Sequence, residues 1–156
     1  MPRFEAVTDI GADLDTTVAF HSDVRGLVEL IPGILQPHVR LCDGDSTTIA
    51  VGFEFEITLT PFGLLRLPPF HARVTAMRHD GERTVIEDEL VEGPFDRWYH
   101  RHVFDDIPGG TRIYDDIRYR GPPGGTLGSL TAPLVLEGLF QYRRNRLIHR
   151  FGRPSR

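Results

Sequence analysis

The segment GPFDRWYHRHVF at 93–104, followed by GGTRIYDDIRYRGP at 109–122, decides the fold of this chain of 156 residues. Side chains alternate between the two faces of a β-strand, so Trp98, His100 and His102 share one face of the first strand. We therefore expect an antiparallel hairpin with an indole and two imidazoles on the same side.

The turn signal Pro108-Gly109-Gly110 reverses the chain after this strand. The second strand of the hairpin can then place Asp115 beside the two histidines. Two imidazoles, an indole and a carboxylate on one face of a sheet predict a cluster of polar side chains inside an apolar pocket. That combination is typical of a binding site or a catalytic site, and it leaves the identity of the ligand open.

Alternating patterns predict further strands on either side of this hairpin. The clearest runs from Ile49 to Leu59, with apolar residues at every second position and glutamates between several of them. This pattern predicts a half-buried antiparallel strand with an aromatic inner face. The remaining strands are expected at 3–10, 35–41, 70–77 and 84–91.

Helical signals are confined to the region after the first strand and to the end of the chain. Asp13 or Asp15 can cap a short helix that ends at His21, and Asp23 can cap a second one over 24–30. From Leu127 onward the apolar period becomes helical, and we expect one continuous helix through Pro133. Its predicted apolar face holds Leu127, Leu130, Leu134, Phe140 and Leu147.

Together these elements predict an α+β helix-grip fold. A curved antiparallel sheet of six or seven strands would wrap around the long C-terminal helix, and two short helices would follow the first strand. The hydrophobic content of 40% is ordinary for a globular protein, and the length suits one domain over residues 1–156. We expect a cavity between the sheet and the closing helix.

The order of elements resembles the START and birch-pollen-allergen superfamily, also called SRPBCC. Three stretches carry the resemblance to its bacterial and archaeal branch of ligand-binding and polyketide cyclase/dehydrase-like proteins. They are DTTVAFHSDVRGLVELIPG at 15–33, IEDELVEGPFDRWYHRHVF at 86–104 and GGTRIYDDIRYRGPPGGTLG at 109–128.

The resemblance also assigns positions within the predicted site. The polar and aromatic positions of the family pattern are matched here by Asp88, Trp98, His100, His102 and Asp115. Two places after the acid the family often has a glutamine, where this chain has a leucine. This departure implies a more apolar pocket and weakens any transfer of the family's chemistry, since fold analogy does not fix function.

Composition excludes several classes of function. Cys42 is the single cysteine, which excludes an internal disulfide, and all 18 basic residues are arginine, which excludes lysine-based catalysis and a P-loop. The net charge of −4 gives the whole chain no attraction to nucleic acid. No apolar run approaches the roughly 20 residues of a membrane span, and no signal-like stretch begins the sequence, so we expect a cytoplasmic protein.

A local cluster of arginines marks the end of the chain. We interpret it as a solvated basic tail, because cations are favoured near the C-terminus of a helix. Its members are Arg143, Arg144, Arg146, Arg150, Arg153 and Arg156.

The function that these features favour is binding of a small hydrophobic ligand, aromatic or polyketide- or lipid-like, in the internal cavity. The expected apolar wall consists of Phe53, Phe55, Ile57, Val74, Trp98, Leu134 and Phe140. Polar selection would come from Asp88, His100, His102 and Asp115. The alternative is a cyclase or dehydratase that uses a cavity histidine, oriented by Asp115, as a general base.

The same residues also raise the question of a metal site. His100 and His102 with Asp115 could hold zinc or iron if His38 or Asp88 supplied a further ligand. The spacing places the two histidines well for binding a metal, but it does not place a third and a fourth ligand. We therefore expect no metal and no cofactor.

The segment TPFGLLRLPPF at 60–70 connects two predicted strands and carries Leu64, Leu65 and Leu67. Leucines in a loop that faces water suggest a flap over the cavity mouth or a surface for homodimer formation. The alternative is that the leucines simply continue two long strands.

Overall fold

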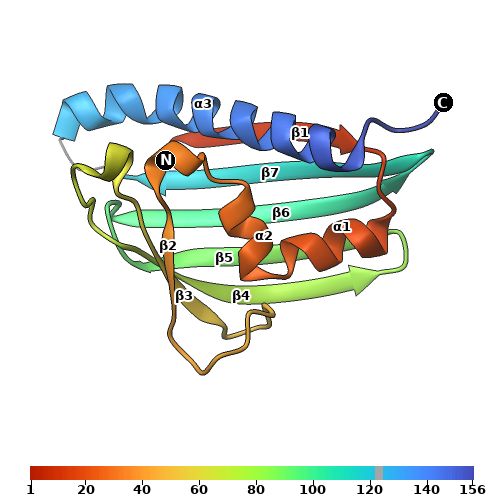
Figure 1. The fold of residues 1–156 in the computed structure, drawn as a ribbon, viewed down its shortest axis with the longest axis horizontal. Coiled ribbons are helices and arrows are strands. Elements are labelled where there is room, and N and C mark those ends of the chain that lie inside the picture. Colours follow the sequence, from red (N-terminus) through yellow and green to blue (C-terminus); the bar gives the residue numbers. More distant parts are fainter. Residues whose placement is uncertain (122–124) are drawn as a thin grey trace.

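The computed structural model describes residues 1–121 and 125–156, and the side chains of 1–121 and 130–156. Within these residues, seven antiparallel strands form one sheet in the order β1-β7-β6-β5-β4-β3-β2 (Figure 1). The strands are β1 Arg3–Ile10, β2 His38–Leu41, β3 Glu54–Thr58, β4 Phe70–Asp80, β5 Arg83–Glu92, β6 Arg97–Ile107 and β7 Gly110–Arg120. The helices are α1 Leu14–His21, α2 Val24–Glu29 and α3 Gly125–Phe151, with short 3₁₀ helices η1 Gly33–Leu35 and η2 Pro61–Gly63.

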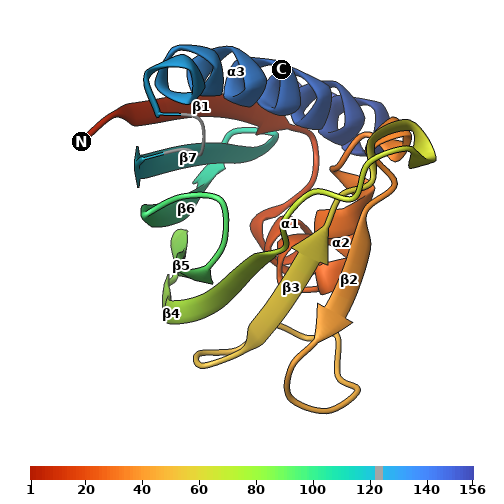
Figure 2. The ribbon, with the colours of Figure 1, turned by 90° about the vertical axis from the view of Figure 1, so that its left-hand side faces the viewer.

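This arrangement is the predicted helix-grip fold. Figure 2 shows the sheet curving from β1 beneath α3 round to β3 and β2, with α1 and α2 on its concave side. At one end, a buried cluster joins Ile10, Leu14, Leu30, Phe104 and Leu147 from β1, α1, the end of α2, β6 and α3. A second cluster joins α3 to β7 and β1, and a third lies between α2 and the β3–β4 pair. The helices thus pack against the sheet in three separate clusters instead of one continuous core.

The predicted helix starts and the central hairpin follow from local chemistry. Asp13 accepts a hydrogen bond from the Thr16 amide at 2.8 Å, and Asp23 accepts one from the Arg25 amide at 2.8 Å. Each carboxylate satisfies a donor at the first turn of a helix, which is the role predicted for it. In the β6–β7 hairpin Ile107 pairs with Gly110, so two residues make the turn, and Gly109 has a φ of +78° that glycine adopts without strain.

Two predicted strands are shorter than expected. The pattern at 49–59 predicted one strand, but β3 begins at Glu54, because Gly52 has a φ of +86° and turns the chain. Val51 was expected on the inner face and is instead 62% exposed. At 35–41, η1 occupies the first position, so β2 begins at His38.

The closing helix α3 is continuous through Pro133, as predicted, but its apolar face is rotated from the expected one. Leu130 and Leu134 are 68% and 74% exposed, and the side chain of Leu127 lies outside the described residues. The buried face instead consists of Ala132, Leu136, Phe140, Arg143 and Leu147, spaced three or four residues apart. Arg143, which was interpreted as part of a solvated tail, is thus a buried residue of this face.

Among the described residues, no helix has the length and apolar character needed to cross a membrane.

Candidate ligand-binding site

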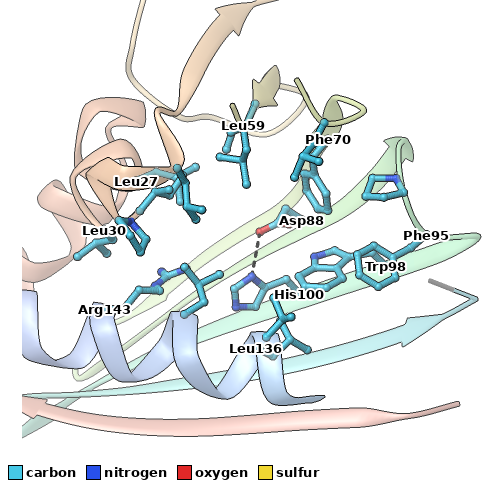
Figure 3. Close-up of a pocket in the computed structure, with 18 of the residues that line it drawn as sticks. Leu27, Leu30, Leu59, Phe70, Asp88, Phe95, Trp98, His100, Leu136 and Arg143 are labelled. Atoms are coloured by element: carbon cyan, nitrogen blue, oxygen red, sulfur yellow. Dashed lines mark ion pairs between the residues drawn. The ribbon is translucent and has the colours of Figure 1, made fainter. Parts of the chain in front are cut away.

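A cavity of about 650 Å³ lies between α3, the concave face of the sheet and the α2–η1 segment (Figure 3). Its wall is mostly apolar: Leu27 and Leu30 come from the α2 region, Phe70 and Trp98 from the sheet, and Leu136 from α3. The curvature of the sheet keeps these side chains apart, so they line a space instead of filling it. A volume of this size suits a small organic molecule.

Eight of the eleven residues predicted for the site lie on the cavity wall. They are Phe55, Ile57, Val74, Asp88, Trp98, His100, His102 and Leu134. Their placement follows from strand alternation in β3 to β6, except for Leu134, which lies on α3 and is mostly exposed. Whether these residues bind a ligand stays a prediction.

The other three predicted residues do not line the cavity. Phe53 precedes β3 and packs between two core clusters, because the strand starts one residue later. Phe140 turns towards β1, where its ring centroid lies 5.0 Å from that of Phe4. Asp115 lies behind the histidines, and their rings separate it from the open space.

The polar part of the wall is a cluster of two histidines and two aspartates from β5, β6 and β7. In the strand register, His100 is opposite Asp88 and His102 is opposite Asp115. His100 Nε2 lies 2.9 Å from Asp115 Oδ1, and His102 Nε2 lies 3.2 Å from Asp88 Oδ2. His102 Nδ1 is also 2.8 Å from Asp115 Oδ1, which is an ion-pair distance. His102 therefore bridges the two carboxylates.

The surroundings separate the protonation states of the two rings. Burial opposes a charge on His102, but hydrogen bonds to Asp115 and Asp88 outweigh it and raise the pKa of His102 to about 9. Burial and the neighbouring charge of His102 lower the pKa of His100. Burial also acts to raise the pKa of Asp115, yet the hydrogen bonds from both histidines hold it well below its usual range. At neutral pH Asp115 is thus a carboxylate, His102 an imidazolium and His100 a neutral imidazole.

The neutral ring has a defined tautomer. Because the Asp115 carboxylate can only accept, His100 must donate from Nε2, which leaves a lone pair on Nδ1. His100 Nδ1 is 4.0 Å from Asp88 Oδ2, beyond hydrogen-bond distance. The cluster thus presents a weak base beside a fixed positive charge.

The same cluster contains one of two groups of potential metal ligands among the described residues, the other being Cys42, Glu54 and His71. The ligating atoms of Asp88, His100 and His102 lie within 4.8 Å of one another, whereas His38 is exposed on β2. A metal would have to displace the proton that His102 holds between two carboxylates, since only a neutral imidazole ligates. The absence of a metal stays a prediction, and stoichiometric zinc or iron in elemental analysis of untagged protein would contradict it.

Three polar residues of the cavity wall, His21, Thr131 and Arg143, were not predicted from the sequence. Arg143 reaches the cavity from α3, and its signal was the spacing 136, 140, 143 and 147 on one helix face. His21 ends α1, where its Nδ1 donates to the Thr17 carbonyl at 2.8 Å. Burial lowers the pKa of His21 to about 3, so its ring is neutral.

The apolar loop at 60–70 is not a continuation of two strands. It contains η2 and extended chain, and Leu64 and Leu65 are 86% and 64% exposed. Leu67 and Pro68 line the cavity, so the loop forms part of its rim. A role for the loop in dimer formation stays a prediction.

No protein-family model and no curated protein sequence matches the chain. Solved structures do match it over almost its whole length. The major latex-like protein 151 of Panax ginseng has a TM-score of 0.69 at 14% identity, with 96% of this chain and 97% of that chain covered. Truncated norcoclaurine synthase from Thalictrum flavum has a TM-score of 0.66 at 15% identity, with 94% and 90% covered.

A third match is the di-domain ARO/CYC protein BexL from the BE-7585A biosynthetic pathway. Its TM-score is 0.64 at 12% identity, and the match covers 96% of this chain and 46% of that chain. Identities this low establish a common fold and carry no statement about activity. The chain therefore shares the helix-grip fold of these structures, which is the fold that its sequence resemblance predicted.

Proposed function

We propose that this protein binds a small hydrophobic ligand, of aromatic, polyketide or lipid-like character, in the cavity under α3. The observation that carries the proposal is a cavity of about 650 Å³ whose wall is apolar except for a compact polar part. Apolar surface drives association, and a few fixed polar groups orient the bound molecule. In this proposal Asp88, His100 and His102 contact the polar end of the ligand.

Titration with N-phenyl-1-naphthylamine, a neutral fluorophore that brightens in apolar surroundings, tests the proposal. We expect saturable binding at one site per chain, with a dissociation constant in the micromolar range. Leu59 lines the cavity, so Leu59→Trp should fill part of the space and weaken binding at least about tenfold, roughly 1.4 kcal/mol.

The matched control is Val51→Trp, which adds the same side chain at an exposed position outside the cavity. Binding by this variant should equal that of the wild type. Equal affinities for all three proteins would place the probe elsewhere and contradict the proposal.

A second candidate function, proton abstraction from an activated methylene as in a cyclase or dehydratase, is favoured by one observation. His100 is neutral and carries its lone pair on Nδ1, next to the positive charge of His102 that could stabilise a developing enolate. Deuterium exchange at the central methylene of an acetoacetyl thioester, followed by NMR, tests it. Exchange should be faster with wild type than with His100→Gln, and equal rates would exclude this function for that substrate.

The loop at 60–70 is proposed to cover the cavity mouth, because Leu67 and Pro68 already lie on its rim. Changing Leu64, Leu65 and Leu67 to serine should speed release of the fluorophore without changing the mass of the protein. Loss of a dimer in sedimentation would instead assign these leucines to a homodimer interface.

We also propose that the protein is cytoplasmic and that residues 1–156 form a single ligand-binding domain.

A further inference from the structure

Arg143 is a buried cation on an apolar wall. The residue is 8% exposed, and its side chain extends from α3 into the cavity, as Figure 3 shows. The guanidinium carbon lies 4.8 Å from the centroid of the Phe140 ring, which supports one face of the group.

Within the described residues, no carboxylate forms an ion pair with Arg143 and no acceptor receives a hydrogen bond from it. Asp88 on the cavity wall and the buried Asp115 are bound to histidines instead, and Asp115 feels the charge of Arg143 without an ion pair to it. By contrast, Arg146 and Arg150 on the same helix both pair with Glu29 at the surface. The chain thus provides carboxylates for exposed arginines of α3 and none for the buried one.

An arginine in this position has unused binding capacity. A guanidinium has five N–H donors in a planar fork and does not lose its charge. Burying such a group without partners is unfavourable, and a partner brought by a ligand removes that cost. Attraction to an anion is also stronger among apolar side chains than in water.

We propose that Arg143 is the anion receptor of the cavity, and that the ligand is a hydrophobic organic acid whose carboxylate binds its guanidinium. This inference rests on the proposed function, because it requires that the cavity be occupied by a small molecule. The carboxylate would accept two parallel N–H bonds from the fork, and the apolar body would lie along Leu136 and Trp98. The polar cluster of β5–β7 would contact other oxygens of the same molecule.

Two fluorophores that differ by one anionic group test this inference. N-phenyl-1-naphthylamine is neutral, and 8-anilinonaphthalene-1-sulfonate is the same ring system with a sulfonate that stands in for the carboxylate. Wild type should bind the sulfonate about tenfold more tightly than the neutral probe. Arg143→Met keeps the apolar stem and removes the charge, so it should abolish this preference while the neutral probe still binds.

The matched control is Arg144→Met, which removes the same charge from the exposed neighbour on α3. It should keep the preference for the sulfonate. If both variants lose the preference equally, the anion binds to the surface charge of the helix and the inference is wrong.

Failure of the inference is distinguishable from failure of the proposed function. Neutral-probe binding with no preference for the sulfonate in wild type overturns the role of Arg143 and leaves the cavity function intact. Absence of binding by both probes overturns the proposed function itself. Thermal melting of each variant checks the fold, and displacement of the sulfonate by naphthalene carboxylic acid but not by its methyl ester extends the test to carboxylates.

Discussion

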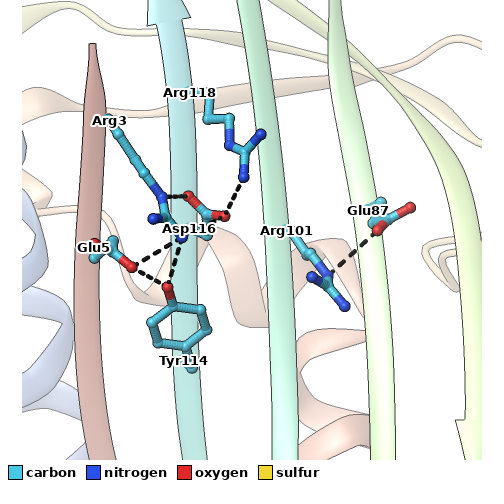
Figure 4. Close-up of polar contacts among 7 residues, drawn as sticks. All are labelled: Arg3, Glu5, Glu87, Arg101, Tyr114, Asp116 and Arg118. Atoms are coloured by element: carbon cyan, nitrogen blue, oxygen red, sulfur yellow. Dashed lines mark hydrogen bonds and ion pairs between the residues drawn. The ribbon is translucent and has the colours of Figure 1, made fainter. Parts of the chain in front are cut away.

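Asp115 and Asp116 are consecutive residues of β7, both almost fully buried, and they point to opposite faces of the sheet. On the concave face, Asp115 receives imidazole groups that are themselves buried. On the outer face, Asp116 accepts two hydrogen bonds from Arg3, at 2.7 and 3.1 Å, and Arg118 lies 3.5 Å away (Figure 4). The pKa of Asp116 is lowered chiefly by its hydrogen bond with Arg3.

The difference lies in where the partners are. Arg3 and Arg118 are about half exposed, so water screens their charges, and the outer network ends in Tyr114 and Glu5 at the surface. The histidines around Asp115 are buried, and their surroundings hold them in different protonation states, with the pKa of His102 raised and that of His100 lowered. On the outer face, Asp116 thus binds Arg3 of the edge strand β1. On the concave face, Asp115 sets the protonation states of two histidines.

The largest effect is expected from Asp115→Asn. The substitution preserves shape but removes the charge opposite the imidazolium of His102, and it replaces one acceptor oxygen by an amide nitrogen that can only donate. We expect a loss of about 3–5 kcal/mol in the free energy of unfolding, measured by urea denaturation at pH 7. A loss below about 1 kcal/mol would mean that the two faces hold their carboxylates in equivalent ways.

The pH dependence of stability should show the concave cluster directly. The pKa of His102 is raised to about 9 from an unfolded value of about 6.5, so its stabilisation is complete below pH 6.5. Stability should therefore fall by about 3 kcal/mol as the pH rises from 6.5 through 9. His102→Gln should flatten this alkaline decline in urea denaturation series, and an unchanged slope would contradict the assignment.

The stability at acidic pH should depend on His21, another histidine that lines the cavity. The pKa of His21 is lowered to about 3, so the unfolded chain binds a proton between pH 6.5 and 3 that the folded chain does not. Stability from this residue is present above pH 6.5 and is lost as the pH falls. His21→Gln should flatten the acid limb and leave the alkaline limb unchanged.

The smallest effect is expected from Asp116→Asn, the matched change on the outer face. Its arginine partners can return to water, so we expect a loss of about 1 kcal/mol in unfolding free energy. That loss should shrink when the salt concentration is raised to about 0.5 M, because exposed charges are screened. Binding of the neutral fluorophore should not change, whereas a large effect on binding would link the outer network to the cavity.

The sequence predicted the histidine–aspartate cluster more accurately than it predicted which face of α3 is buried. Alternation assigned His100 and His102 to one face, and the two-residue turn fixed the register that brings His102 opposite Asp115. Both signals are local, and burial of the apolar neighbours reinforces them. The role of Asp115 behind the rings, and not on the cavity wall, depends on side-chain directions that alternation does not specify.

Arg143 and the start of β3 required tertiary information. A charged residue in a helical pattern is usually exposed, and only the packing of α3 against β1 and β7 turns Arg143 inward. At 49–53 the apolar alternation continues through a turn, so pattern alone extended the strand. Both errors arose where the environment of a side chain is set by segments distant in sequence.

The pairing of β1 with β7 has a consequence for the order of folding. Residues such as Phe4 and Ile117 are register partners, so the first strand finds its neighbour only after most of the chain has been synthesised. The β4–β5 and β5–β6 hairpins, which carry Asp88, His100 and His102, pair strands that are neighbours in sequence and can form before β7 is synthesised. The nascent chain would thus form most of its polar cluster before α3 covers the cavity. On a ribosome stalled after β6, β1 should lack its partner strand and expose an unpaired edge.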